Sequence, residues 1–308
     1  MKWKIYLIML IMTWSGTVFS QACCSAGTPI IGSLALPPAE NGKMLFALSY
    51  DYNNLNDLYS ESEKIDDGSR QRLTKAFILE SSYGLSDYFS LNALFSYVQQ
   101  VRTIQSIVPG QEDNQLNAQG LGDALLMVTY KMMRSNIMSP TSLHFGVGVK
   151  APVGESDLKH NGILLPIDLQ PGTGSWDLAF RASVYHRFVS GSKFEVFSTT
   201  AYRINGENER EYSVGDEFLL FGGGGYSPSD YFRILMQVGY RFAREDQQFG
   251  EIISSTGGQW LDFLPALEIN AIDNVGIRLS GQVPLHRDLN GVQLTTTYKF
   301  TLSLLYGL

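Results

Sequence analysis

The sequence predicts an all-β protein that closes into an antiparallel transmembrane β-barrel of about 12 strands. Three observations support this fold class. Segments of about 9–12 residues alternate apolar and polar side chains, which is typical of strands that cross a bilayer. The connections between these segments are short and long in turn, and after the first twenty positions no apolar run is long enough for a membrane helix.

The composition agrees with a folded, membrane-inserted chain. Of the 308 residues, 17% are charged, against about a quarter in soluble domains, while 44% are hydrophobic and 12% are aromatic. This balance excludes a disordered chain, and the net charge of −7 argues against a nucleic-acid partner. In hydrocarbon every backbone N–H and C=O must be paired, so a closed sheet is what remains once membrane helices are excluded.

The amino terminus has the three parts of an export signal within residues 1–20. Lys2 and Lys4 form the basic start, Ile5–Trp14 the apolar core, and 15–20 a polar exit of small residues. We therefore expect export to the outer membrane of a Gram-negative-type bacterium. Residues 21–42 are expected to form a periplasmic segment that precedes a barrel over 43–308. This segment has three candidate roles: lying beneath the barrel, plugging it, or contacting a periplasmic partner.

The two cysteines, Cys23 and Cys24, are adjacent, so no disulfide framework joins distant parts of the chain. Cleavage after Ala22 would make Cys23 the first residue and raise the alternative of lipidation. A copper or thiol role for the pair is another alternative. The four histidines are scattered without the spacing of a metal site, and no cofactor is expected.

The strands follow from the alternation of side chains. Along 44–52 every even-numbered residue is apolar or aromatic, which places these residues on one face of a strand, and 298–308 repeats the pattern. The expected strands are 43–53, 71–84, 88–100, 121–133, 141–152, 174–188, 194–204, 214–226, 231–242, 260–271, 275–285 and 294–308.

The connections alternate in length. The short ones are 85–87, 134–140, 189–193, 227–230 and 272–274, and the long polar ones are 54–70, 101–120, 153–173, 205–213, 243–259 and 286–293. A soluble sandwich has no reason to sort its loops in this way, whereas an outer-membrane barrel has short periplasmic turns and long external loops.

Several motifs resemble a known family of outer-membrane barrels. They are Tyr83–Asp87 (YGLSD), Gly120–Ala124 (GLGDA), Phe145–Gly154 (FGVGVKAPVG) and Asp168–Asp177 (DLQPGTGSWD). With these motifs, most of the mature chain resembles the family named for a MetA pathway of phenol degradation, whose members are often called transporters. The resemblance implies a barrel that passes small organic compounds across the outer membrane.

The polar face of the barrel is expected to point into its lumen. An Arg or Lys facing lipid at the bilayer midplane costs about 2–4 kcal/mol. These inward residues either form a selectivity lining or close the interior as paired charges. The expected pore-lining residues are Asp123, Lys150, Asp177, Arg181, Arg233, Arg241, Glu268 and Arg278.

The stretch 162–168 is unusually apolar for an external loop. Leu164, Leu165 and Ile167 are candidates for a constriction or an apolar entrance at the barrel mouth. The alternative is that this stretch simply extends two strands above the membrane.

The expected function is a channel or transporter for small solutes, aromatic or apolar organic compounds among them, with outer-membrane lipid as its surroundings. A structural or surface-interaction barrel without transport is the first alternative. A lipid-modifying enzyme is the second, since Ser142 and His144 share a strand face. Their order is the reverse of the known phospholipase motif, and no supporting Asn or Asp can be placed beside them, so an enzyme is not expected.

Overall fold

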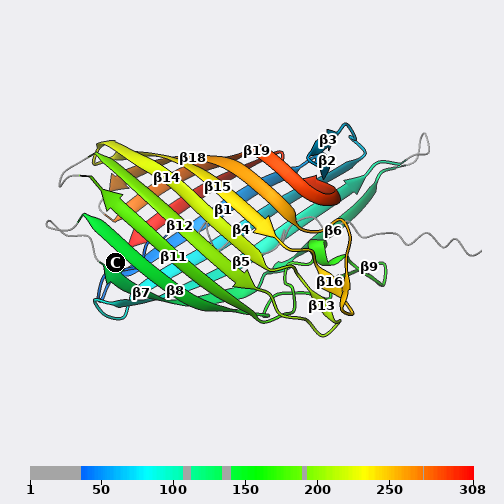
Figure 1. The fold of residues 1–308 in the computed structure, drawn as a ribbon, viewed down its shortest axis with the longest axis horizontal. Helices are drawn as coiled ribbons and strands as arrows, with labels where there is room; N and C mark the ends of the chain where they lie inside the picture. The colour runs from blue at the N-terminus through cyan, green and yellow to red at the C-terminus, as the bar shows by residue number, and fades with distance from the viewer. Residues whose placement is uncertain (1–35, 107–111, 134–139, 189–192, 273) are drawn as a thin grey trace, which may run out of the picture.

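The structure is a computed structural model that describes residues 36–106, 112–133, 140–188, 193–272 and 274–308. Twelve tilted antiparallel strands, each paired with the next along the chain, form a closed barrel (Figure 1). They are β1 (Met44–Leu55), β4 (Arg70–Gly84), β5 (Phe89–Ile104), β7 (Ala124–Met133), β8 (Thr141–Ala151), β11 (Asp177–Arg187), β12 (Phe194–Ile204), β14 (Glu217–Ser229), β15 (Phe232–Ala243), β18 (Gly258–Ile272), β19 (Val275–Thr295) and β20 (Tyr298–Gly307).

The first and last strands close the sheet. β1 pairs with β20 in one unbroken register from Leu45↔Gly307 to Asn54↔Tyr298. Closure satisfies the backbone groups that an open sheet would leave at its two edges, which is the condition for crossing hydrocarbon. The predicted fold class, a closed antiparallel barrel of 12 strands, is therefore confirmed.

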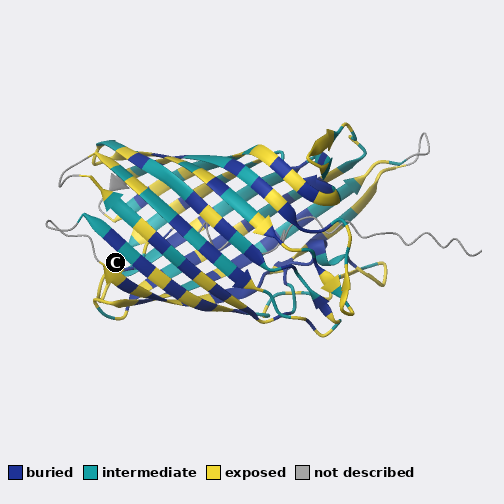
Figure 2. Ribbon diagram, in the orientation of Figure 1, coloured by how far each residue is buried: buried dark blue, intermediate teal, exposed yellow. Residues whose placement is uncertain are grey.

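Side chains alternate between the two faces of the wall as predicted. On β8, Phe145, Val147 and Val149 are 42%, 56% and 39% exposed, whereas the residues between them are buried. The same alternation gives the wall its chequered pattern of exposed and buried positions in Figure 2. Because the exposed positions are mostly apolar, the outer surface suits a lipid environment.

The long connections lie at one end of the barrel and carry short elements of their own (Figure 1). No helix among the described residues is long and apolar enough to cross a membrane. The elements of these connections are β2 (Asp57–Glu61), β3 (Glu63–Ile65), β6 (Asn114–Leu121), β9 (Lys159–His160), β10 (Ile163–Leu164), the short 3₁₀ helix η2 (Ile167–Leu169), β13 (Tyr212–Ser213), β16 (Gln247–Gln248) and β17 (Glu251–Ile252).

Two of the expected connections are wrong in detail. The expected loop at 286–293 belongs to β19, which continues to Thr295 because its distal half pairs with β2, for example Leu294↔Leu58. The expected loop at 101–120 is also partly strand. β6 pairs with the outer half of β5 and so extends the wall beyond β7. Backbone hydrogen bonds to neighbouring strands thus hold several residues in an extended conformation, although their polar side chains are typical of loops.

The described end of the N-terminal segment, residues 36–42, lies against the inner wall. Leu36 and Ala39 are buried, and Pro37 lines the internal cavity. The Ala39 N–H donates to Ser82 Oγ at 2.9 Å, and Lys131 Nζ donates to the Ala39 carbonyl oxygen at 2.7 Å. The proposed export signal and Cys23 with Cys24 lie outside the described residues.

Candidate functional site

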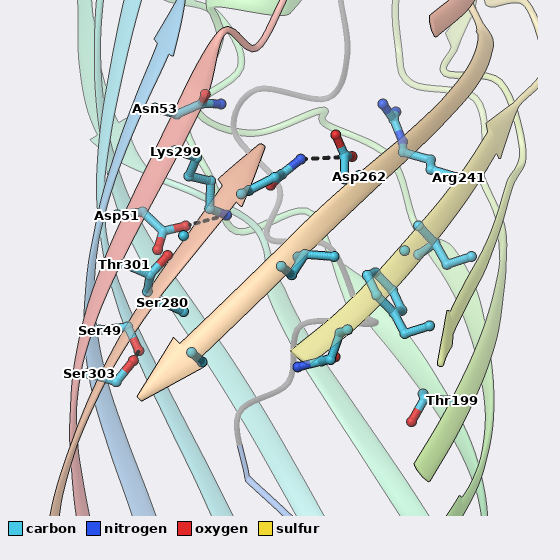
Figure 3. Close-up of a pocket in the computed structure, with 18 of the residues that line it drawn as sticks. Ser49, Asp51, Asn53, Thr199, Arg241, Asp262, Ser280, Lys299, Thr301 and Ser303 are labelled. Carbon is cyan, nitrogen blue, oxygen red and sulfur yellow. Dashed lines mark hydrogen bonds and ion pairs between the residues drawn. The ribbon is translucent and has the colours of Figure 1, made fainter. Parts of the chain in front are cut away.

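The barrel encloses a cavity of about 450 Å³ that follows the strands along most of their length. On β1 it is lined from Ser49 to Leu55, on β4 from Arg72 to Glu80, and on β15 from Arg233 to Arg241. These residues come from the inward face of each strand. Figure 3 shows part of this polar lining, with Asp51 facing Lys299 and hydroxyl side chains below them. The cavity therefore spans nearly the whole height of the β15 wall.

Acidic and basic side chains are paired across the lining. Lys299 Nζ lies 2.8 Å from Asp51 Oδ2, and Arg287 Nη2 lies 2.5 Å from Asp262 Oδ1. The side chain of Arg287 is only 1% exposed, so its charge is compensated by Asp262 rather than by water. Pairing of this kind fixes the positions of the side chains that define the lumen.

Four of the eight expected pore-lining residues, Arg181, Arg233, Arg241 and Arg278, line the cavity. Arg278 pairs with Glu268 at 2.7 Å, and Arg233 lies 3.8 Å from the same carboxylate and also contacts Glu195.

Arg241 pairs with Glu217, and its guanidinium carbon lies 4.2 Å from the centre of the Trp260 ring. Arg203 lies on β12, opposite Glu217 of β14, and binds the other oxygen of the Glu217 carboxylate at 2.5 Å. Arg241 is therefore held in place on two sides, by a carboxylate and by an aromatic face.

Asp123, Lys150 and Asp177 form a buried cluster at the external end of the wall. Lys150 Nζ lies 3.0 Å from Asp123 Oδ2 and 2.6 Å from Asp177 Oδ2, and all three side chains are at most 3% exposed. Lys150 also donates to Thr173 Oγ1. The cavity lining that the described residues form includes none of Asp123, Lys150 and Asp177. We call Asp123, Lys150, Thr173 and Asp177 the Asp123 junction.

The Asp123 junction explains why the sequence motifs are rich in glycine. Asp123 accepts from the N–H groups of Gly154 and Thr173, at 3.1 and 2.9 Å. A Cβ atom added to Gly154 or Gly172 would come within 2.9 Å of the Asp123 carboxylate and within 2.8 Å of nearby backbone. The three motifs that contain GLGDA, APVG and QPGTGS thus meet at one point, where close backbone approach requires glycine.

The apolar residues of the third long loop differ in how far they are buried. Leu165 is 4% exposed and packs with Ala118 and Leu169, whereas Leu164 is 39% exposed and Ile167 is half-buried. None of Leu164, Leu165 and Ile167 belongs to the cavity lining that the described residues form. Their role as a constriction or entrance stays a prediction.

The same loop contributes an ionic contact that sequence reasoning missed. Asp168 Oδ2 lies 2.9 Å from Arg72 Nη1 and also contacts Arg102. Arg72 lines the cavity, so this contact joins the loop to the mouth of the lumen. Alternation along a strand can place Arg72 on the inner face, but no local signal indicates that a loop residue 96 positions away reaches it.

The candidate catalytic pair is not assembled as a hydrolase site. Ser142 and His144 both line the cavity, yet no hydrogen bond joins them in the described part of the chain, and His144 Nδ1 has no partner there. His144 instead lies beside the Tyr185 ring, with centroids 5.9 Å apart. No group of three or more His, Cys, Asp or Glu residues suited to a metal occurs among the described residues.

Comparison with solved structures supports the fold. The chain is similar to the COG4313 outer membrane channel from Pseudomonas putida F1, with a TM-score of 0.69 and 16% identity over 91% of this chain and 100% of that one. It is also similar to the β domain of the Bordetella autotransporter BrkA, with a TM-score of 0.50 and 9% identity over 87% of this chain and 100% of that one.

No protein-family model and no curated protein matches the chain. The resemblance to the phenol-degradation family therefore stays a prediction from sequence. What the solved structures share with this chain is the architecture of an outer-membrane barrel.

Proposed function

We propose that the protein is an outer-membrane channel that passes small solutes through a lumen of mixed charge. The observation that carries this proposal is the cavity of about 450 Å³, which follows β15 from Arg233 to Arg241. A barrel built only as a scaffold has no need of an internal space lined by charged side chains. The apolar outer wall and the expected export signal in residues 1–20 favour the outer membrane as the location.

The lining favours small anions and neutral solutes over cations. Six arginines and one lysine border the cavity, against three acidic residues, although most of these cations are paired with carboxylates set behind them. Rings of basic side chains favour anions because their positive charge attracts the passing ion. We infer a modest preference for anions rather than a strict filter.

Conductance of the full-length protein in planar lipid bilayers tests the proposal. We expect discrete current steps and a reversal potential that indicates anion preference in a salt gradient. Ala266→Trp, on the cavity side of β18, is expected to reduce the step size, whereas Leu267→Trp, on the outer face of the same strand, leaves it unchanged. Folded protein that inserts without producing current steps, both as the wild type and as the Asp168→Asn variant described next, would exclude a channel.

A barrel without transport is the second candidate, and the Arg72–Asp168 ion pair favours it. This buried contact holds an external loop over the mouth of the cavity. In that case the wild-type barrel stays electrically silent, and Asp168→Asn does not open it. Current steps that appear only in Asp168→Asn would instead identify a channel closed by its loop.

A further inference from the structure

Arg181 differs from the other basic residues of the cavity because its charge has no partner among the described residues. Arg72, Arg233, Arg241, Arg278 and Arg287 each form an ion pair with a carboxylate. Within the described parts of the chain, Arg181 has neither an ion pair nor a hydrogen bond, and its Nε atom is buried without an acceptor. The residue is only 9% exposed, so bulk water compensates its charge poorly.

The strand register places polar groups in the row next to Arg181. Two positions along β11, Ser183 pairs with His144 on β8 and with Thr199 on β12. His144 is 9% exposed, and its Nδ1 atom also lacks a partner. Two buried nitrogen atoms without a hydrogen-bond partner among the described residues thus border the same cavity, and Thr199 lies on the same wall (Figure 3).

Aromatic side chains form the following row of the wall. Tyr185 pairs with Phe197 across β11 and β12, and the centroids of their rings are 6.0 Å apart. Phe221, which is next to Thr199 in the register, lines the cavity beside them. These rings face the lumen rather than the lipid, although inward positions of a water-filled barrel are usually polar.

A buried guanidinium without a partner is costly, and an anion that binds it removes that cost. A carboxylate suits this position because it accepts two parallel N–H bonds from a guanidinium. The aromatic row, which lies two rows along β11 from Arg181, suits an apolar or aromatic body attached to that carboxylate. An inorganic anion would leave the aromatic row without a role.

We propose that Arg181, with His144, Thr199 and the Tyr185–Phe197 pair, forms a binding site for small organic carboxylates with an apolar or aromatic body. This proposal rests on the proposed channel function and specifies its solute class. Arg181 holds the carboxylate, and the aromatic pair contacts the apolar part. The other arginines of the lumen keep their carboxylate partners and contribute little to this affinity.

Calorimetric titration of the full-length protein in detergent tests the site, with 3-phenylpropionate as the probe and acetate and 3-phenylpropan-1-ol as comparisons. We expect 3-phenylpropionate to bind more tightly than either comparison. Arg181→Gln should weaken its binding at least ~10-fold, the usual effect of losing a charge-assisted hydrogen bond, while binding of the alcohol stays unchanged. Arg278→Gln, which removes the same charge from a paired arginine of the same cavity, should change it less than ~3-fold.

A second variant separates the two parts of the site. Phe197→Leu is expected to weaken binding of 3-phenylpropionate but not of acetate. Equal losses in Arg181→Gln and Arg278→Gln would show a general charge effect and overturn the proposal, as would undetectable binding to the wild-type protein. Arg181→Lys, which keeps the charge, is expected to retain part of the affinity if Arg181→Gln folds poorly, and equal losses in Arg181→Lys and Arg181→Met would also overturn it.

Failure of this proposal and failure of the channel function are distinguishable. Current steps without binding of 3-phenylpropionate leave the channel in place and exclude the site. Binding that depends on Arg181, in a barrel that gives no current steps as the wild type or as Asp168→Asn, excludes the channel and with it the claim that the site serves transport.

Discussion

Asp168 and Arg72 form a buried ion pair of 2.9 Å although they belong to an external loop and to the barrel wall. Their side chains are 3% and 0% exposed, so protein groups rather than water compensate these charges, and Asp168 has both Arg72 and Arg102 as partners. Removing one partner of such a pair costs about 3–5 kcal/mol because the remaining charge stays buried. The contact therefore determines how firmly the third long loop is held over the lumen.

We expect Asp168→Asn to loosen this loop without unfolding the barrel. Backbone amides of 158–170 should exchange hydrogen for deuterium faster, and the single-channel current should become noisier. The matched control is Asp157→Asn, an exposed carboxylate of the same loop. Unchanged exchange in Asp168→Asn would show that the ion pair does not hold the loop.

Gly172→Ala is expected to destabilise the Asp123 junction by about 1–3 kcal/mol, the usual effect of overpacking a well-packed site. The new Cβ would lie 2.8 Å from Asp123 Oδ1 and 2.8 Å from the backbone of Gly154. Denaturant unfolding in lipid vesicles measures the loss. Gly68→Ala serves as the control, since its Cβ would meet nothing within 4 Å, and equal stability of the two variants would contradict the role of the close approach.

Leu302→Arg tests which face of the wall contacts lipid. Leu302 is 52% exposed and lies between Tyr50 and Leu279 on the neighbouring strands. An arginine facing hydrocarbon near the midplane should reduce the free energy of unfolding in vesicles by about 2–4 kcal/mol. Ile163→Arg, at a 75% exposed position of an external loop, should have little effect, and similar losses in both variants would argue against the assigned membrane face.

The external contact between Tyr212 and Asp246 predicts a dependence on pH. Tyr212 Oη donates to Asp246 Oδ2 at 2.5 Å, and the Gly215 N–H donates to Asp246 Oδ1 at 2.8 Å. Burial raises the pKa of Asp246 above the usual value of a carboxyl group, despite these hydrogen bonds. The folded loop thus binds this proton more tightly than the unfolded loop does.

Stability from a raised pKa is fully present below the unfolded pKa and is lost as the pH rises through the folded pKa. Hydrogen exchange of β13 and β16, corrected for the intrinsic effect of pH, should therefore show weaker protection as the pH rises through the pKa of Asp246. Asp246→Asn, which cannot ionise, is expected to flatten this dependence. A wild-type protection that increases over the same interval would contradict the assignment.

The wall of the barrel was predictable because its physics is local. A period of two along each segment determines which face meets lipid, and the expected strand at 141–152 differs from β8 by one residue. The first and last strands also pair as the closed fold requires, for example Leu48↔Leu304. Prediction weakened where strands extend above the membrane, because polar residues such as Arg287 and Gln293 are typical of loops yet lie in β19.

The candidate site was predictable only in part. Alternation placed Arg181 and Arg233 on the inner face, and both line the cavity. It gave no indication that Arg233 has carboxylate partners on two other strands while Arg181 has none among the described residues. Ion pairing depends on contacts between side chains far apart in sequence, which no local pattern records.

The Asp123 junction has a consequence for the order of assembly. Its members lie on β8, on the long loop after it, at the start of β11 and in the break between β6 and β7. Hairpins between neighbouring strands join residues that are close in sequence, so they form early. The contacts of the Asp123 junction involve four separate segments, so they form only once all four are in place. We therefore expect the mouth of the barrel to become ordered only after the surrounding hairpins have inserted, so that a nascent barrel passes through a stage in which its outer end is not yet ordered.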